Sequence, residues 1–273
     1  MSINSLTSGS STAQSGILGS LSSNSNSIAN IQLQLSTNKK ILDPAQQGVV
    51  TRLSSQVTGF AAAHNNIAKA QNVLNVAATG LSSISNLLTQ MQDLANKAND
   101  ATMQDTDRAK LQKTFQHLLD QITSVSTSSK VDNTGLLDSG SADLVIQTGL
   151  TTATSDQTTI SAVKADTSTL GLDTADISTA SGAAGAIDAL ATALSTVSES
   201  QSSVAADQAG LSSLDTLNAS ISDNLKNTID SIQKPDAAQL QMDLQNMNNQ
   251  QSMNYYLINQ MNQEAQGVLT IFR

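Results

Sequence analysis

Apolar residues recur at alternating intervals of three and four along the last part of the chain. Read at alternating steps of four and three, the stripe is Leu240, Leu244, Met247, Gln251, Asn254, Ile258, Met261, Ala265, Val268 and Phe272. Eight of these ten positions are apolar, and the residues between them are largely Gln and Asn. A period close to 3.5 is typical of a coiled-coil seam. A helix cannot bury such a stripe by itself, so the pattern predicts a partner helix.

A similar stripe near the other end of the chain is the expected partner. It consists of Ile17, Leu21, Ile28, Ile31 and Leu35, again with neutral polar neighbours. Burying so few aliphatic side chains recovers less free energy than ordering the residues that carry them costs. We therefore expect both ends to be disordered in the isolated chain and to fold when neighbouring copies add buried surface.

The strongest period of seven lies between these two stripes. Its members are Leu53, Phe60, Ile67, Leu74, Leu81, Leu88 and Ala95. A companion row reads Val57, His64, Gln71 and Ala78, followed after a one-residue shift by Ile84 and Met91. These rows predict a helix of about 50 residues.

The remaining elements follow from caps, turns and shorter patterns. Asp105 is the expected N-cap of a second helix, which presents Leu111, Phe115, Leu118, Ile122 and Val125 on one face. The β-branched runs DLVIQTG and QTTISAV predict a hairpin. A long helical pattern resumes near Ala186.

The chain therefore runs out along one set of helices and returns along another. Pro44 and Lys234–Pro235 interrupt the pattern at matching places. We predict a mainly α fold, a long antiparallel helical bundle or coiled coil with paired terminal helices and a small β-hairpin region. The expected parts are paired ends at 1–36 and 236–273, a connector at 37–52, and a central bundle at 53–235 with the hairpin region at 132–175.

Composition narrows the possible functions. Three Phe, two Tyr and no Trp suit a narrow helical seam better than a wide core. A net charge of −9 with only 13 Lys and Arg argues against binding nucleic acid or a membrane surface. The N-terminus lacks the features of a cleaved signal peptide, and no apolar run approaches the length of a membrane span.

No arrangement of residues supports catalysis, a metal or a cofactor. There is no Cys, and the two histidines, His64 and His117, lack metal-ligand spacing. Gln201, Gln208, Asp215 and Gln251 interrupt apolar seams. They are either simple interruptions or residues that tune packing between copies. We expect a protein that is not an enzyme.

The order of these motifs resembles that of bacterial flagellins over nearly the whole chain. The segment from LSTNKKILDPAQQG to DLANKAND is similar to the family's connector and first bundle helix. DLVIQTG and TLGLDT are similar to its strand pair and a following signature, and QEAQGVLTIFR is similar to its terminal consensus.

The resemblance implies a structural subunit that polymerises into the flagellar filament, with the terminal helices as an inner tube and the bundle as an outer tube. It implies secretion through the flagellar export apparatus and an extracellular location in the flagellum. The implied partners are other copies of the chain, an export chaperone, hook-associated proteins and cap proteins. Only a short segment follows TLGLDT before the return helix, so we expect no outer variable domains.

The resemblance also identifies the positions that an innate Toll-like receptor reads in the family. They correspond to Gln90, Leu94 and Thr114, where the family has Arg, Leu and Glu, so only the Leu is shared. Two alternatives share parts of the pattern: a hook–filament junction protein, and a secreted monomeric coiled-coil effector or adhesin.

Overall fold

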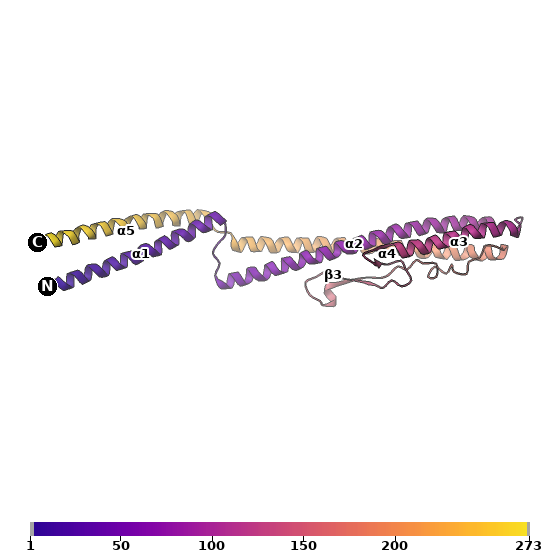
Figure 1. Ribbon diagram of the computed structural model, residues 1–273, viewed down its shortest axis with the longest axis horizontal. Helices are drawn as coiled ribbons and strands as arrows, with labels where there is room; N and C mark the ends of the chain where they lie inside the picture. Colours follow the sequence, from indigo (N-terminus) through magenta and orange to yellow (C-terminus); the bar gives the residue numbers. More distant parts are fainter. Residues whose placement is uncertain (1–2, 272–273) are drawn as a thin grey trace. The chain divides into compact units, whose positions relative to one another are not determined.

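Long helices make up most of the chain, which confirms the mainly α fold. The computed structural model describes residues 3–271, and side chains over 12–267. Its elements are α1 (Ile3–Thr37), α2 (Pro44–Ala98), α3 (Asp105–Ser128), β1 (Lys130–Val131), β2 (Thr134–Gly135), β3 (Leu144–Gln147), the 3-10 helix η1 (Thr154–Asp156), β4 (Gln157–Ile160), α4 (Ala180–Gln233) and α5 (Ala237–Ile271). Figure 1 shows them in sequence colours.

The chain divides into two compact units. Unit 1 comprises Met1–Leu53 and Lys226–Arg273, and unit 2 comprises Ser54–Leu225. In unit 1, α1 and α5 lie side by side with the chain ends at the same end of the pair, so the two helices are antiparallel (Figure 1). Unit 2 contains a bundle of α2, α3 and α4 with the two hairpins.

The core of unit 2 uses two heptad rows on α2. The row from Ile67 to Ala95 is fully buried, as the period of seven predicts. The second row differs from the expected one and needs no shift: it is Ala63, Ala70, Ala77, Ile84, Met91 and Ala98. His64 lies one position away from this row and is exposed. Four of the six members of the observed row are alanines, whose hydrophobicity is low. The sequence pattern therefore did not distinguish this row from the neighbouring positions.

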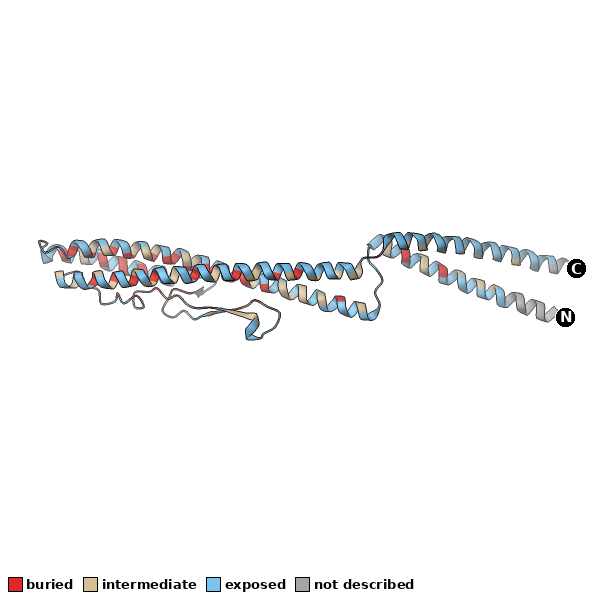
Figure 2. Cartoon of the chain, turned by 180° about the vertical axis from the view of Figure 1, so that it is seen from behind, coloured by how far each residue is buried: buried red, intermediate tan, exposed pale blue. Residues whose placement is uncertain are grey.

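Side chains from α3, α4 and the loops complete this core. Phe115 and Ile122 on α3 are fully buried, and so are Leu190 on α4 and Leu137 and Leu172 in the irregular segments. In Figure 2 the buried positions follow the facing sides of these helices.

The hairpins confirm the expected β region. β3 and β4 pair antiparallel, with Ile146 opposite Thr158. β1 and β2 form a shorter antiparallel pair whose turn residues, Asp132 and Asn133, both have positive φ values. Such values are required by the tight turns that best match strand twist, and Asn and Asp tolerate them.

Two helix starts differ from the expected ones. α2 begins at Pro44, and the Asp43 carboxylate accepts a 2.8 Å hydrogen bond from the Gln46 N–H. Proline is favoured at the first position of a helix because the amide there has no intrahelical partner. Of the expected connector, 37–52, only residues 38–43 are therefore non-helical. The cap position of α3 is Gln104, not Asp105, which pairs instead with Arg108.

Within the described residues, one stretch, Ala180–Gly267, is long and apolar enough to cross a membrane by length and composition alone. Its first half places Ala183, Leu190 and Val197 in the core of unit 2. Core helices pass the same test, and 28% of the apolar window is buried in the structure.

Candidate functional site: the seam between the terminal helices

The seam is the set of α1 and α5 residues that face each other in unit 1. Their half-buried or buried positions recur every three or four residues, as in a two-helix coiled coil. On α5 the half-buried positions include Leu240, Leu244, Met247, Gln251, Asn254, Ile258 and Met261. On α1 the seam positions include Ile17, Leu21, Asn24, Ile28, Ile31 and Leu35.

The structure therefore puts the predicted stripe residues on facing sides of one helix pair. Ile31 is buried, and the others with described side chains are half-buried. The Val268 side chain and Phe272 lie outside the described residues. Two helices alone cannot enclose a seam, and this explains why half-burial is the rule.

Polar side chains interrupt the seam near its middle. The Asn24 amide nitrogen donates a 2.7 Å hydrogen bond to the carbonyl oxygen of Met247. The Gln251 amide nitrogen donates to the Ser25 hydroxyl at 3.3 Å. The sequence pattern missed Asn24 because it considered apolar residues only, although Asn24 falls in the gap between Leu21 and Ile28.

The outer faces of the pair carry large apolar side chains that the chain itself does not cover. Leu18 and Leu33 on α1 are exposed, as are Met253, Tyr255 and Tyr256 on α5. Tyr256 is 68% exposed. Met253 and Tyr256 are three residues apart and so lie on one side of α5, and exposed apolar surface of this kind is typical of a site that binds another protein.

Backbone contacts join the inner ends of the pair. The Lys40 N–H donates a 2.6 Å hydrogen bond to the carbonyl oxygen of Gln233, where α4 ends. Pro235 is buried in the break between α4 and α5. Both interruptions predicted from proline thus lie close to the place where α1 ends and α5 begins.

Three of the polar residues singled out in the long helices, His64, Asp215 and Gln208, have hydrogen-bond partners within the chain. His64 Nδ1 lies 2.5 Å from Asp215 Oδ1 across α2 and α4. The Gln208 amide nitrogen donates to Asn75 Oδ1 at 3.0 Å. His117 is exposed on α3. Among the described residues, no group of three or more His, Asp or Glu side chains could hold a metal ion.

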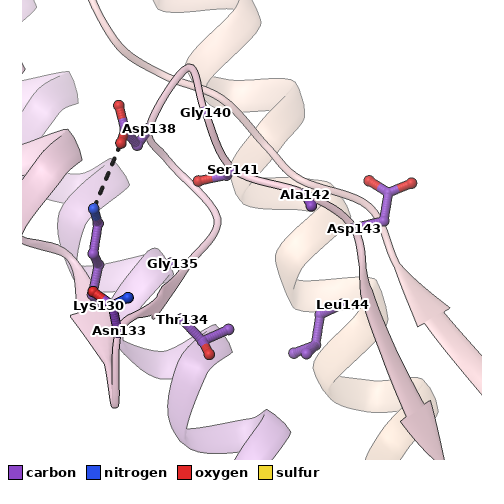
Figure 3. A pocket seen from close by; sticks show the side chains of 10 residues that line it. All are labelled: Lys130, Asn133, Thr134, Gly135, Asp138, Gly140, Ser141, Ala142, Asp143 and Leu144. Carbon is purple, nitrogen blue, oxygen red and sulfur yellow. Dashed lines mark ion pairs between the residues drawn. The ribbon is translucent and has the colours of Figure 1, made fainter.

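A shallow polar hollow of about 300 Å³ lies beside the first hairpin. Figure 3 shows the Lys130 ammonium and the Asp138 carboxylate at its rim, 3.5 Å apart. Apart from Leu144, its other lining residues are small or polar, including Gly135, Gly140 and Ser141. Lys130 and Asp138 neutralise each other, and the Asp143 carboxylate accepts a hydrogen bond from the Ala162 N–H.

The shifted pKa values arise from local contacts. Hydrogen bonds from the Thr102 N–H and hydroxyl lower the pKa of the Asp100 carboxyl. Hydrogen bonds from the Thr151 hydroxyl and N–H lower that of Asp156. The Asp107 carboxylate raises the pKa of Lys110, and desolvation raises that of Asp207. The first three are turn or helix-surface contacts, not the environment of a catalytic group.

The expected receptor positions lie on unit 2. Gln90 on α2 and Thr114 on α3 are exposed. Leu94 is half-buried and packs against the core. The shared leucine therefore has a structural role that would be present with or without a receptor.

The first half of the chain, residues 9–143, matches the family model for the bacterial flagellin N-terminal helical region. The chain is 25% identical over 264 residues to flagellin FljO of Caulobacter vibrioides, with 94% of each chain covered. It is 25% identical over 231 residues to a flagellin of Halalkalibacterium halodurans, with 85% of each covered.

Of the following two solved structures, the first shares the fold of this chain. A putative flagellar hook-associated protein from Vibrio parahaemolyticus has a TM-score of 0.55 and 15% identity over 68% of this chain and 97% of that one. A flagellin from Bacillus cereus has a TM-score of 0.46 and 26% identity over 60% of this chain and 88% of that one.

Proposed function

This chain belongs to the bacterial flagellin family, and we infer from this that it is a structural subunit that polymerises into the flagellar filament. Flagellins form the extracellular filament used for motility. The observation that carries the mechanism is the half-buried seam between α1 and α5, flanked by exposed apolar side chains. In a filament, neighbouring copies of the chain would pack against this surface and bury it.

We propose that folding of the terminal helices is coupled to assembly. The seam residues Ile17, Leu21, Ile28, Ile31 and Leu35 meet Leu240, Leu244, Met247, Ile258 and Met261, with Val268 and Phe272 continuing the stripe. One pair leaves these side chains half-exposed, so a second layer of helices from neighbouring subunits adds the missing burial. The terminal helices are then disordered in the free subunit.

We further propose that the paired ends, 1–36 and 236–273, build the inner tube of the filament. The central bundle, 53–235, builds the outer tube, and 37–52 connects the two. The separation of the chain into two compact units supports this division.

Export and assembly require further partners. The exposed apolar face with Met253, Tyr255 and Tyr256 needs a cover before polymerisation. We propose that an export chaperone supplies this cover and that the flagellar export apparatus secretes the chain. Hook-associated and cap proteins would then contact the two ends of the filament.

The protein needs no catalytic activity for this role. His64 is engaged with Asp215, and the perturbed carboxyls Asp100 and Asp156 serve turns. Receptor activation through Gln90, Leu94 and Thr114 is expected to be weak, since Leu94 alone matches. A reporter-cell assay with the purified protein tests this, and strong activation would contradict it.

A hook–filament junction protein is the second candidate. The fold likeness to a putative hook-associated protein motivates it. A junction protein would be present in few copies, whereas a filament subunit would dominate filaments sheared from cells. Quantitative mass spectrometry of sheared filaments separates the two, and pelleting of the purified chain under polymerising conditions separates both from a monomeric effector or adhesin.

The direct test of the seam uses Leu244→Asp and Ile258→Asp. Each puts a carboxylate on a seam that assembly would bury, so we expect loss of filaments in electron micrographs. The α-helical circular dichroism and cooperative melting of unit 2 should remain. Gln245→Asp is the matched control, because it adds the same charge beside Leu244 at an exposed position and should assemble. Normal filaments from Leu244→Asp would contradict the mechanism.

A further inference from the structure

Asn24 is a buried amide at a seam position of α1. It falls between Leu21 and Ile28 at the heptad spacing, and it is only 6% exposed. Among the α1 seam positions, only Ile31 is buried to a similar extent. One of the two best-covered positions of an apolar seam is therefore polar.

The amide is only half satisfied. Its nitrogen donates to the Met247 carbonyl oxygen at 2.7 Å, while its buried oxygen Oδ1 has no hydrogen-bond partner among the described residues. A buried acceptor without a donor lowers stability, so leucine would hold the two helices together more firmly. Asn24 thus lowers the stability of the α1–α5 pair, so its presence at this position calls for a reason other than stability.

A second amide lies in the same layer of the seam. Gln251 occupies a seam position of α5, and its amide nitrogen donates to the Ser25 hydroxyl at 3.3 Å. We call Asn24 and Gln251 the polar layer. The flanking seam residues are Leu21 and Ile28 on α1, and Met247 and Asn254 on α5.

A shifted register would take the two amides out of their common layer and separate Gln251 from the Ser25 hydroxyl, whereas the backbone carbonyl that Asn24 uses has an equivalent in every heptad. If α5 slipped along α1 by one heptad, Gln251 would leave Ser25. Its amide would then face either Ile17 and Leu21 or Ile28 and Ile31, depending on direction. Aliphatic neighbours offer an amide no hydrogen bond, so both slips are penalised. An entirely apolar seam would carry no such penalty, because every heptad resembles the next.

The chain connections do not fix the register by themselves. A slip of one heptad displaces a helix by about 10 Å. At up to about 3.5 Å per residue, the six-residue segment 38–43 reaches about 20 Å, twice that displacement, whereas the three-residue segment 234–236 reaches only about 10 Å. The Lys40–Gln233 hydrogen bond is a single contact that either slip would break.

We propose that the polar layer of Asn24 and Gln251 selects the register of α1 against α5. The register of α1 against α5 determines which exposed side chains of the two helices, such as Leu18 and Tyr255, lie next to each other on the outer surface of the pair. The layer thereby sets the surface that a second copy of this chain would meet. That consequence rests on the proposed function, whereas the register itself does not.

Disulfide trapping in the full chain tests the register, and the absence of native Cys makes the readout clean. In an antiparallel pair aligned by the Asn24 and Gln251 contacts, Ile17 comes opposite Ile258. Ile17→Cys with Ile258→Cys reports the native register. Ile17→Cys with Ala265→Cys reports a slip in one direction, and Ile31→Cys with Ala237→Cys reports a slip in the other. Oxidised filaments are compared on non-reducing gels, where cross-links within one chain change its mobility, and the free chain is used only if the parent chain forms no filaments.

With Asn24 in place, only the native pair should oxidise efficiently. In Asn24→Leu, the yield of at least one slipped pair should rise about fivefold or more, and more still in the double variant Asn24→Leu with Gln251→Leu. Asn24→Gln keeps an amide and should restore the native pair alone. Leu21→Met changes the seam without touching the layer and should also keep it.

The two possible failures are distinguishable. A native-only pattern in Asn24→Leu and in the double variant would overturn the register proposal. Lack of filaments from the parent chain would instead overturn the proposed function, and the cross-link pattern of the same sample would still decide the register.

Discussion

At the scale of single residues, Arg108 joins the end of α2 to the start of α3. Its guanidinium donates to the carbonyl oxygens of Ala98 and Asp100, both at 2.7 Å, and pairs with the Asp105 carboxylate. The side chain is only 6% exposed. The last carbonyls of a helix lack intrahelical donors, so the buried guanidinium satisfies the Ala98 carbonyl at the end of α2 and also binds the Asp100 carbonyl in the turn that follows.

We predict that Arg108→Gln destabilises unit 2 by about 2 kcal/mol, because buried hydrogen bonds from a charged group are lost and the Ala98 carbonyl loses its side-chain donor. Urea unfolding followed by circular dichroism measures the change. Lys110→Gln is the control: the Lys110–Asp107 pair is exposed and should not move the midpoint. Equal midpoints for both variants would contradict the capping role of Arg108.

Asp156 organises the loop between β3 and β4. Its carboxylate accepts hydrogen bonds from the Thr151 N–H at 2.8 Å and the Thr151 hydroxyl at 2.5 Å. These bonds favour the ionised form and lower the pKa of Asp156 in the folded chain. The stabilisation is therefore fully present above the unfolded pKa, about 3.9, and is lost as pH falls through the lower folded value.

We predict that the Asp156 carboxyl titrates below its usual value, as measured by its carbon chemical shift in NMR. Thr151→Val removes the hydroxyl and should move the titration upward, whereas Thr152→Val nearby should leave it unchanged. An unaltered titration in Thr151→Val would show that the hydroxyl is not the cause.

At the scale of whole elements, α2 depends on small residues wherever another segment approaches it closely. A Cβ added at Gly80 would lie 2.5 Å from the Ser129 hydroxyl oxygen and 2.6 Å from a methyl carbon of Leu137. Ser129 follows α3, and Leu137 lies in the irregular segment beyond the first hairpin. Gly80 therefore allows that segment to pack against α2.

We predict that Gly80→Ala destabilises unit 2 by about 1–3 kcal/mol, because overpacking outweighs the gain in helix propensity. Gly210→Ala on α4 is the matched control. Its added methyl group meets nothing within 4 Å, so helix propensity should stabilise the chain by up to about 1 kcal/mol. In thermal melts, the melting temperature should fall for Gly80→Ala and rise for Gly210→Ala relative to the parent chain. A shift of both melting temperatures in the same direction would contradict the packing argument.

At the scale of the whole molecule, charge is unevenly divided. Unit 2 contains 17 acidic and 7 basic residues, a net −10, whereas unit 1 contains 5 acidic and 6 basic residues, a net +1. Subunits that polymerise would bring the acidic units near one another. The terminal helices of unit 1 would meet without such repulsion.

We predict that polymerisation is faster at about 150 mM than at about 10 mM NaCl, because the screening length falls from about 30 Å to about 8 Å. Light scattering follows the assembly. Neutralising the exposed Asp93 and Asp188 on unit 2 with Asp→Asn changes should weaken the salt dependence. Assembly that slows as salt rises would exclude repulsion between the acidic units as the barrier.

The sequence by itself determined the helices, their heptad faces and their out-and-back order. Ile67 to Ala95, the two terminal stripes and the β3–β4 hairpin are visible in it because helix and strand periods are local properties of the chain. The seam was therefore predictable as a pattern of apolar residues on two helices.

Only the tertiary structure decided which polar residues serve that fold. Asn24 resembles any other asparagine in a polar stretch until α5 covers it, and Arg108 is one of 13 cations until α2 and α3 meet around it. Ala63 and Ala70 reveal their burial only when another helix lies against them. Burial and hydrogen-bond partners depend on segments distant in sequence, and no local period encodes that distance.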